Sequence, residues 1–252
     1  MKFLLAPDSF KGTITSQQAI ELLQESAIKH FPDAQFLQVP VADGGEGTVE
    51  SLVWATGGQI RTVAVTDPLG RPVQANYAVT PDNKAIIEMA KASGLPLLAP
   101  EERNPLLTTS YGTGELVKAA LDEGIRDFYI ALGGSATNEG GTGFAQALGV
   151  KFLDRHGKSI GMGIGRRIKQ IHRIDRDGVD PRILESKITV ICDVNNPLTG
   201  PDGATYIYGP QKGATPGMQV ELESGMMHYA NVIQREFGVD ITEMAGAALP
   251  GA

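Results

Sequence analysis

The sequence has little of several features that mark whole classes of protein. Among its 252 residues there is one cysteine, Cys192, which excludes an internal disulfide and favours a cytoplasmic location. No apolar run approaches the roughly 18 residues that a membrane span requires. The opening segment MKFLLAPDSF also lacks the small-residue cleavage site of a signal peptide. We therefore expect no membrane partner.

Positive charge and metal-binding patterns are scarce as well. Lys and Arg number 22 against 29 Asp and Glu, which gives a formal net charge of −7. A nucleic-acid-binding protein normally carries a basic face, so no nucleic-acid partner is expected. The histidines at positions 30, 156, 172 and 228 do not have the spacing of metal ligands and predict no zinc site.

Glycine, in contrast, is abundant. The chain has 31 glycines without a collagen-like period, more than the usual share of about 7%. We expect them in loops that need unusual backbone angles or approach a ligand closely. Hydrophobic residues make up 42% of the chain, which is enough apolar material for a folded core.

Apolar segments and turn signals alternate along the chain in a way typical of α/β proteins. Thr15 and Gln18 predict a capping box at the start of the first helix. Turn signals at 67–70 and 81–83 separate three short segments and predict that these segments form an antiparallel meander. Strands are expected at 2–6, 37–41, 61–66, 73–79, 85–89, 128–132 and 188–192. Helices are expected from 15 to about 31, after 48, and over 115–121, 142–148 and 218–237.

Four of the predicted strands run directly into a polar loop, at Asp8, Asp43, Gly133 and Asp193. In parallel α/β sheets, ligands bind at the carboxyl ends of the strands. If these strands share one sheet and one direction, their loops meet at one edge. Carboxylates, Lys11, hydroxyl groups and backbone N–H groups would then lie together. This set suits phosphoryl transfer, in which N–H groups, Lys and Mg²⁺ stabilise the transferred negative charge.

Each loop also has a purely structural interpretation. Asp8 could cap the following helix, and Asp193 could cap a turn. The loop Gly133–Gly141 could be a tight turn, and Lys212 could be a solvated loop lysine. The chain lacks the Walker A pattern, so a nucleotide site would be of another kind. An NAD-dependent oxidoreductase is not favoured, because no G-x-G-x-x-G follows the first strand.

Six motifs then occur in an order that identifies a family. They are PDSFKG at 7–12, VADGGEGT at 41–48, TSYGTGEL at 109–116, GGSATNEGG at 133–141, CDVNNPLTG at 192–200 and YGPQKGA at 208–214. Together they resemble the bacterial glycerate kinase family, from Met1 to about Met244. The resemblance implies phosphorylation of D-glycerate with ATP and Mg²⁺ as cofactors. It favours 2-phosphoglycerate as the product over 3-phosphoglycerate.

The resemblance also implies an α/β fold with two unequal parts. Residues 1–60 would be the first part of a flavodoxin-like parallel-sheet domain whose C-terminal part is largely missing. Residues 61–240 would be an inserted mixed α/β domain, and 241–252 a divergent tail. Members of the family continue beyond position 252, so the resemblance implies a C-terminal truncation. The alternative is a non-catalytic remnant that binds an anion or a partner, and a homo-oligomer is left open.

Site residues follow from the resemblance position by position. The expected catalytic residues are Asp8, Lys11, Asp43 and Asp193, with Asp8 or Asp193 as general base on the acceptor hydroxyl. The expected metal ligands are Asp43, Glu46 and Asp193. The expected substrate- and nucleotide-binding residues are Ser9, Gly44, Gly45, Glu46, Gly47, Thr48, Gly133, Gly134, Ser135, Thr137, Asn138, Asn196, Gln211 and Lys212. Glu139 stands where members of the family usually have Asp.

Overall fold

A computed structural model describes residues 1–10, 13–41, 47–192, 194–244 and 246–247. Six expected site residues lie outside the described residues: Lys11, Asp43, Gly44, Gly45, Glu46 and Asp193. Within the described ranges, no helix combines the length and the apolar character needed to cross a bilayer.

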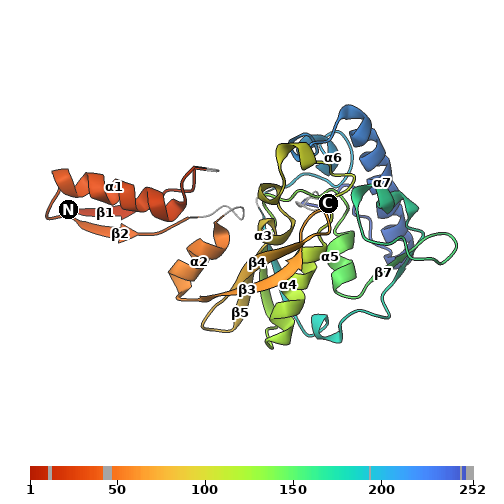
Figure 1. Ribbon diagram of the computed structural model, residues 1–252, viewed down its shortest axis with the longest axis horizontal. Helices are drawn as coiled ribbons and strands as arrows, with labels where there is room; N and C mark the ends of the chain where they lie inside the picture. The colour runs from red at the N-terminus through yellow and green to blue at the C-terminus, as the bar shows by residue number, and fades with distance from the viewer. Residues whose placement is uncertain (11–12, 42–46, 193, 245, 248–252) are drawn as a thin grey trace.

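The chain is a mixed α/β protein, as expected (Figure 1). The strands are β1 Lys2–Leu5, β2 Gln35–Gln38, β3 Gln59–Thr66, β4 Pro72–Val79, β5 Lys84–Glu88, β6 Asp127–Ala131, β7 Lys151–Leu153, β8 Arg173–Asp175 and β9 Lys187–Ile191. The α-helices are α1 Ser16–His30, α2 Thr48–Thr56, α3 Ala90–Ser93, α4 Tyr111–Asp122, α5 Thr142–Ala147, α6 Ala204–Tyr208 and α7 Pro216–Phe237. Short 3₁₀ turns are η1 Leu95–Leu97, η2 Pro100–Glu102, η3 Gly165–Gln170, η4 Pro181–Ile183 and η5 Pro210–Lys212.

The N-terminal layer consists of β1, α1 and β2, at one end of the molecule (Figure 1). β1 and β2 pair in parallel, and α1 joins them as a crossover helix. The capping box is confirmed, because the N–H of Gln18 donates to Thr15 Oγ1 and the N–H of Thr15 donates to Gln18 Oε1. The Phe3 ring lies 5.2 Å from that of Phe31 and 5.4 Å from that of Phe36, which fixes the helix on the sheet.

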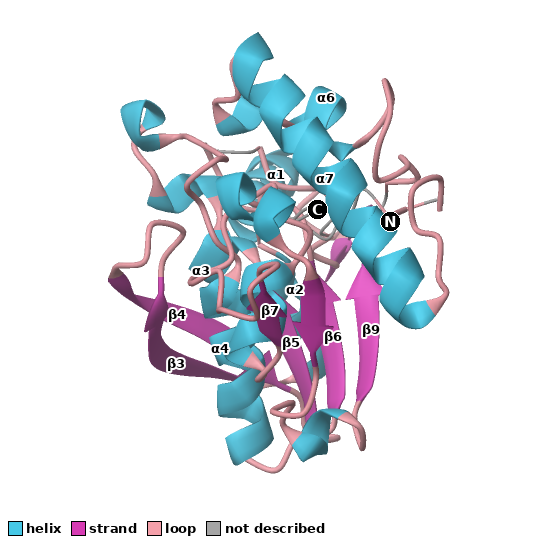
Figure 2. Cartoon of the chain, turned by 90° about the vertical axis from the view of Figure 1, so that its right-hand side faces the viewer, coloured by secondary structure: helices cyan, strands magenta, loops and turns pink. Residues whose placement is uncertain are grey.

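A five-stranded sheet in the order β3-β4-β5-β6-β9 forms the larger part of the molecule. The predicted antiparallel meander over β3, β4 and β5 is confirmed. Asp67 shapes its first turn, since Asp67 Oδ1 accepts from the backbone N–H groups of Leu69 and Arg71 at 2.8 Å. β5, β6 and β9 are parallel and lie side by side (Figure 2).

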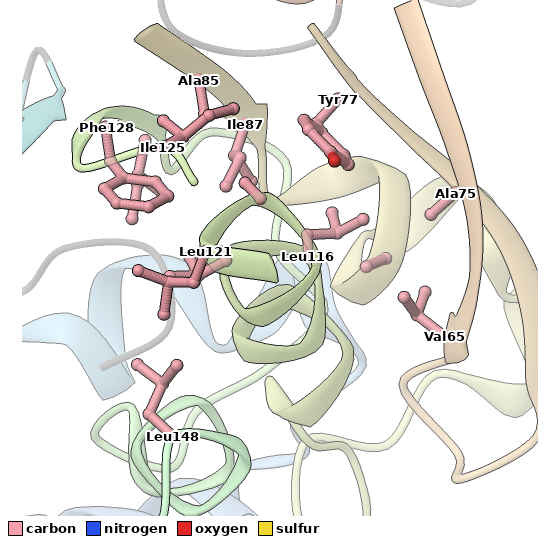
Figure 3. Packing of buried hydrophobic residues seen from close by; sticks show 14 residues of the cluster. Val65, Ala75, Tyr77, Ala85, Ile87, Leu116, Leu121, Ile125, Phe128 and Leu148 are labelled. Atoms are coloured by element: carbon pink, nitrogen blue, oxygen red, sulfur yellow. The ribbon is translucent and has the colours of Figure 1, made fainter. Parts of the chain in front are cut away.

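The main hydrophobic core lies between α4 and one face of this sheet (Figure 3). Leu116 and Leu121 of α4 pack with Ile87, Phe128 and other fully buried side chains of the sheet. Close packing requires glycine in the first turn of α4. A Cβ at Gly112 would lie 1.9 Å from the carbonyl oxygen of Thr66, so any side chain there would push the helix off β3.

A second core lies under α7, the longest helix. Thr215 caps it, and its predicted apolar stripe is confirmed by the burial of Leu222, Met226 and Tyr229. Met226 and Tyr229 pack with Phe152 of β7 and with Ile168 in the neighbouring 3₁₀ turn.

The condition that all four of the strands that run into polar loops share one sheet is not met. The strands before Asp8 and Asp43 pair with each other, whereas those before Gly133 and Asp193 belong to the five-stranded sheet. A local alternation of apolar and polar residues identifies a strand but does not encode its neighbours in the sheet. The second strand is also displaced, to 35–38 from the expected 37–41. The helix expected over 115–121 begins earlier, at Tyr111, because a buried carboxylate elsewhere in the chain binds its first turn.

Candidate functional site

The carboxyl ends of β5, β6 and β9 lie at one edge of the large sheet. Glu88, Ala131 and Ile191 occupy the same register position in these three strands. The chain that follows each strand therefore begins at the same edge, which is where parallel α/β sheets bind their ligands. These segments contain Lys91 after β5 and Gly133 after β6.

The loop that follows β6 is fastened to the segment that follows β5. The N–H of Leu95 donates to the carbonyl of Gly134 at 2.9 Å, and the N–H of Ala136 donates to the carbonyl of Ser93 at 2.9 Å. Gly134 has φ 75°, a left-handed conformation that side chains rarely adopt. Gly134 is exposed and Gly133 is half-buried, so this end of the loop offers its backbone to a ligand.

The middle of the same loop is closed from solvent. The side chains of Ser135, Thr137 and Asn138 are buried. Ser135 Oγ, Thr137 Oγ1 and Asn138 Oδ1 have no hydrogen-bond partner among the described residues. Leaving such an atom unpaired costs about 1–3 kcal/mol, so packing alone does not account for three of them in one loop.

Lys212 secures this loop from the opposite side. Its Nζ donates to the carbonyl oxygen of Thr137 at 2.5 Å, and the residue is only 2% exposed. Burial lowers the pKa of Lys212 to about 8, and the nearby charge of Glu139 opposes the shift. The interpretation of Lys212 as a solvated loop lysine is therefore wrong.

Glu139 is a buried carboxylate that joins two helices to the loop. It accepts from the N–H of Ser110 at 2.9 Å and from the Ser110 hydroxyl, at the start of α4. It also accepts from Thr142 Oγ1 at 2.6 Å and from the N–H of Gly143 at 3.1 Å, in the first turn of α5. Burial raises the pKa of Glu139, and these hydrogen bonds oppose the shift.

A cleft of about 570 Å³ lies between the N-terminal layer and α2. Its lining brings the expected residues Ser9 and Gly47 together with Glu50, Trp54 and Lys91. Asp8 is exposed next to it, with Asp8 Oδ1 accepting from the N–H of Ser9 at 2.7 Å. Thr48 is buried directly after Gly47.

Lys91 connects the cleft to the edge of the large sheet. Its Nζ lies 2.8 Å from Glu50 Oε1, across the cleft wall. Ser93, in the same short helix α3, accepts through its carbonyl oxygen from the N–H of Ala136 in the loop that follows β6. The segments after β1, β2 and β5 thus contribute Ser9, Gly47 and Lys91 to one cavity, although the strands belong to two sheets.

Sequence reasoning missed four residues here: Glu50, Trp54, Glu88 and Lys91. The signal was present, because Glu88 lies near the end of the strand predicted over 85–89, and Lys91 follows that strand closely. The turn signals assign this strand only to the antiparallel meander, so its carboxyl end is not expected at the ligand-binding edge. β5 pairs antiparallel with β4 but parallel with β6, so its carboxyl end lies at the ligand-binding edge.

Asn196 and Gln211 do not line this cleft, and neither do the expected residues of the loop after β6. Asn196 Nδ2 donates to the carbonyl of Asp202 at 2.8 Å, and Tyr208 OH donates to Asn196 Oδ1 at 2.6 Å. Asn196 therefore holds the turn before α6. Gln211 is exposed in the 3₁₀ turn that contains Lys212.

No group of three or more His, Cys, Asp or Glu side chains is arranged to hold a metal ion, as far as the described residues go. The expected metal ligands Asp43, Glu46 and Asp193 are outside those residues. Lys91 and the exposed backbone at Gly134 fit the negative charge of phosphate groups.

Comparisons with known proteins identify the family. The model of the glycerate kinase family matches residues 3–252. A glycerate kinase from Haemophilus influenzae is 51% identical over all of this chain and 66% of its own length. A glycerate 2-kinase from Escherichia coli is 48% identical over the same shares. The crystal structure of a proposed glycerate kinase 2 from Salmonella typhimurium LT2 has a TM-score of 0.88 and 46% identity, and the match covers 100% of this chain and 67% of that one.

The chain spans about 66% of the length of these two curated relatives. The likeness nevertheless extends over the whole of this chain, through every motif on which the resemblance was based. The chain belongs to the glycerate kinase family.

Proposed function

We propose that this chain is an ATP-dependent kinase that phosphorylates a hydroxyl group of D-glycerate. The observation that carries the proposal is the family match over residues 3–252, together with relatives named as glycerate kinases. The cleft supports it, because an anionic organic acid needs a cation and polar groups in a confined space. Lys91 and Ser9 supply these in about 570 Å³.

Within this proposal, the Lys91 ammonium pairs with the glycerate carboxylate or with a phosphate group. Glu50 holds the ammonium at 2.8 Å and orients it. Asp8, exposed beside Ser9, or Asp193 takes the proton from the acceptor hydroxyl. Lys11 follows Ser9 closely in the chain, and Thr48 follows Gly47 as the first residue of α2.

ATP binds, in this proposal, at the carboxyl edge of β5, β6 and β9. Its phosphates meet the backbone at Gly133 and Gly134, and Lys212 keeps that loop in shape through Thr137. The remaining substrate- or nucleotide-binding residues proposed are Gly44, Gly45, Ser135, Asn138, Asn196 and Gln211. Mg²⁺, held by Asp43, Glu46 and Asp193, neutralises phosphate charge when it is bound.

The domain division is also a proposal: 1–60, 61–240 and a tail from 241. The parallel pair β1–β2 with its crossover helix α1 supports a flavodoxin-like first part. Leu4 and Leu37 are paired on the outer face of this sheet, and each is 64% exposed. Parallel sheets normally have both faces covered, so this is the face that a further layer would cover. A cytoplasmic location is proposed too, on the strength of the single cysteine.

The test is release of ADP by the purified chain with D-glycerate and Mg-ATP. We expect release that depends on glycerate and is lowered at least tenfold by Lys91→Met, since a charge-assisted contact contributes about 1.5–3 kcal/mol. Lys169→Met, which breaks only a surface pair with Glu221, is the control and should leave the rate unchanged. Phosphorus NMR identifies the product, because 2-phosphoglycerate couples its phosphorus to one proton and 3-phosphoglycerate to two.

Absence of glycerate-dependent ADP from a folded sample would refute the proposal for this chain. Thermal stabilisation by glycerate or ATP without turnover would favour the non-catalytic alternative instead.

A further inference from the structure

Glu88 is a buried carboxylate with no role in the mechanism above. It is the last residue of β5 and is 0% exposed. It does not line the 570 Å³ cleft, so it does not touch a ligand bound there. Its position is nevertheless directly behind the first turn of α2, whose preceding residue Gly47 does line the cleft.

The start of α2 needs an acceptor from elsewhere. The first N–H groups of any helix have no partner within the helix, and a side chain at the N-cap normally binds one of them. The N-cap here is Gly47, at φ 90°, which has no side chain to offer. Glu88 takes that role from a neighbouring strand, since Glu88 Oε2 accepts from the N–H of Val49 at 3.4 Å.

Apolar packing fixes the same turn on the sheet. Val49 is completely buried and packs with Ala78 of β4 and Ile86 of β5. Glu50, the next residue, turns to the other side and pairs with Lys91 in the cleft wall. The position of the Glu50–Lys91 pair therefore depends on how the first turn of α2 is held.

The groups that face Glu88 determine its charge. Burial raises the pKa of Glu88 to about 7. Lys91, on the segment after β5, favours the ionised carboxylate, as do the N–H groups of Val49 and Gly47. Glu50 of α2 opposes it. Asn76 of β4 lines a cavity of about 240 Å³ together with Glu88, and its amide is neutral.

We propose that Glu88 is a positioning residue for the proposed kinase: by binding the N–H of Val49 it fixes the first turn of α2 and, with it, Gly47 and the Glu50–Lys91 pair in the substrate cleft. The inference rests on the proposed function only for the identity of the ligand. That the Glu88 carboxylate holds the start of α2 can be tested without any measurement of activity.

Two variants separate the hydrogen bond from the charge. Glu88→Gln keeps an oxygen that can accept from Val49, whereas Glu88→Ala removes the acceptor. We expect Glu88→Ala to raise KM for glycerate about tenfold, and Glu88→Gln to stay within about twofold of the wild type at pH 8. A protonated Glu88 also keeps a carbonyl oxygen that can accept from Val49, so protonation of Glu88 below about pH 7 should change the wild-type KM by no more than about twofold. Glu185→Ala, a change of a surface carboxylate, is the control.

A second measurement needs no catalysis. Trp54 lies on α2 and is the only tryptophan, so its fluorescence reports on this helix. We expect the fluorescence of the wild type and the nitrogen shift of the Val49 amide to titrate with a midpoint near pH 7. Both transitions should be absent in Glu88→Gln, and the Val49 amide should exchange with solvent faster in Glu88→Ala.

The outcomes are separable. If KM and Val49 exchange are unchanged in Glu88→Ala, or if Gln is as damaging as Ala, the positioning role is refuted. If no glycerate kinase activity is found at all, the proposed function fails, and the Val49 and Trp54 titrations still decide the role of Glu88. If Glu88→Ala does not fold, the Trp54 and Val49 titrations of Glu88→Gln test the role of Glu88. Their loss would support that role, and their survival would refute it.

Discussion

The ammonium group of Lys212 donates a hydrogen bond to the carbonyl oxygen of Thr137 at 2.5 Å, with both residues buried. Glu139, two residues further on, binds the starts of α4 and α5. The loop after β6 is thus held by a buried cation on one side and a buried anion on the other. Its exposed end, at Gly134, is presented to a ligand by a rigid frame rather than by a mobile turn.

Replacement of Lys212 tests the cationic side of this frame. Lys212→Met keeps most of the buried volume but leaves the Thr137 carbonyl without its donor. We expect a loss of about 1–3 kcal/mol of stability, because a buried acceptor is unpaired while the desolvation of a charge is relieved. KM for ATP should rise as the loop loosens. Urea denaturation measures the first effect and ADP release the second, with exposed Lys158→Met as control.

An unchanged denaturation midpoint together with an unchanged KM for ATP would show that Lys212 does not hold the loop.

The anionic side of the frame gives a second prediction. In Glu139→Gln one carboxylate oxygen becomes an NH₂ group that faces the donors of Ser110, Thr142 or Gly143. The NH₂ group and one of these hydrogen-bond donors would then face each other in a buried site without an acceptor. We expect a loss of about 2–4 kcal/mol in the free energy of unfolding. Urea denaturation with circular dichroism measures it.

Glu223→Gln is the matched control for this change. Glu223 is also buried, but only Glu223 Oε1 is engaged, accepting from the N–H of Gly200 at 2.6 Å, and Glu223 Oε2 has no partner among the described residues. An amide can satisfy that arrangement, so the cost should be below about 1 kcal/mol. Equal losses for the two variants would contradict the capping role of Glu139.

The parts of the fold that could be predicted from the sequence are those that depend on local chemistry. The capping box at Thr15 and Gln18 and the turn at Asp67 are each encoded within a few residues. The apolar stripe of α7 depends only on helical periodicity. The pairing of β1 with β2, apart from the large sheet, depends on long-range contacts that no local pattern contains.

The same limit explains what could be predicted of the site. Motifs in the loops predicted Ser9 and Gly47, and the structure brings both to one cleft. The burial of Lys212 could not be predicted, because its solvation is decided by a loop 75 residues away in the chain. Glu88 was missed because its significance comes from α2 packing over β5 and from the parallel pairing of β5 with β6.

Close approach of α4 to β3 gives a third prediction. In Gly112→Ala the new Cβ would lie 1.9 Å from the Thr66 carbonyl oxygen and 3.3 Å from Ala92 Cβ. Backbone must move to relieve this contact, and we expect a loss of about 2–4 kcal/mol in the free energy of unfolding. The melting temperature measured by calorimetry should fall accordingly.

Gly217→Ala is the control, in the first turn of α7, where a Cβ meets no atom within 4 Å. Alanine is the better helix former, so this change should stabilise the protein by about 0.5–1 kcal/mol. If Gly112→Ala also stabilised the protein, α4 would not be in contact with β3 as described.

The dependence of stability on pH gives a fourth prediction, for Glu88. The folded-state pKa of Glu88, about 7, lies above the ordinary value of 4.5 for a glutamate. Between these values the folded protein binds more protons than the unfolded chain, so this residue makes stability fall as pH rises and then level off above about pH 7. The full effect is at most about 3 kcal/mol. Glu88→Gln cannot titrate, so it should match the wild type near pH 4.5 and exceed its stability near pH 8.

Urea midpoints across this range measure the difference between the two proteins. Glu102→Gln should show the opposite sign, because the hydrogen bond from Arg71 lowers the pKa of Glu102. The stability that Glu102 contributes is therefore present at neutral pH and lost as pH falls through its folded-state pKa. A difference between wild type and Glu88→Gln that stays constant with pH would mean that Glu88 is ionised in the folded protein throughout. The burial of its carboxylate behind α2 would then have to be offset by stronger hydrogen bonds than the 3.4 Å contact with Val49.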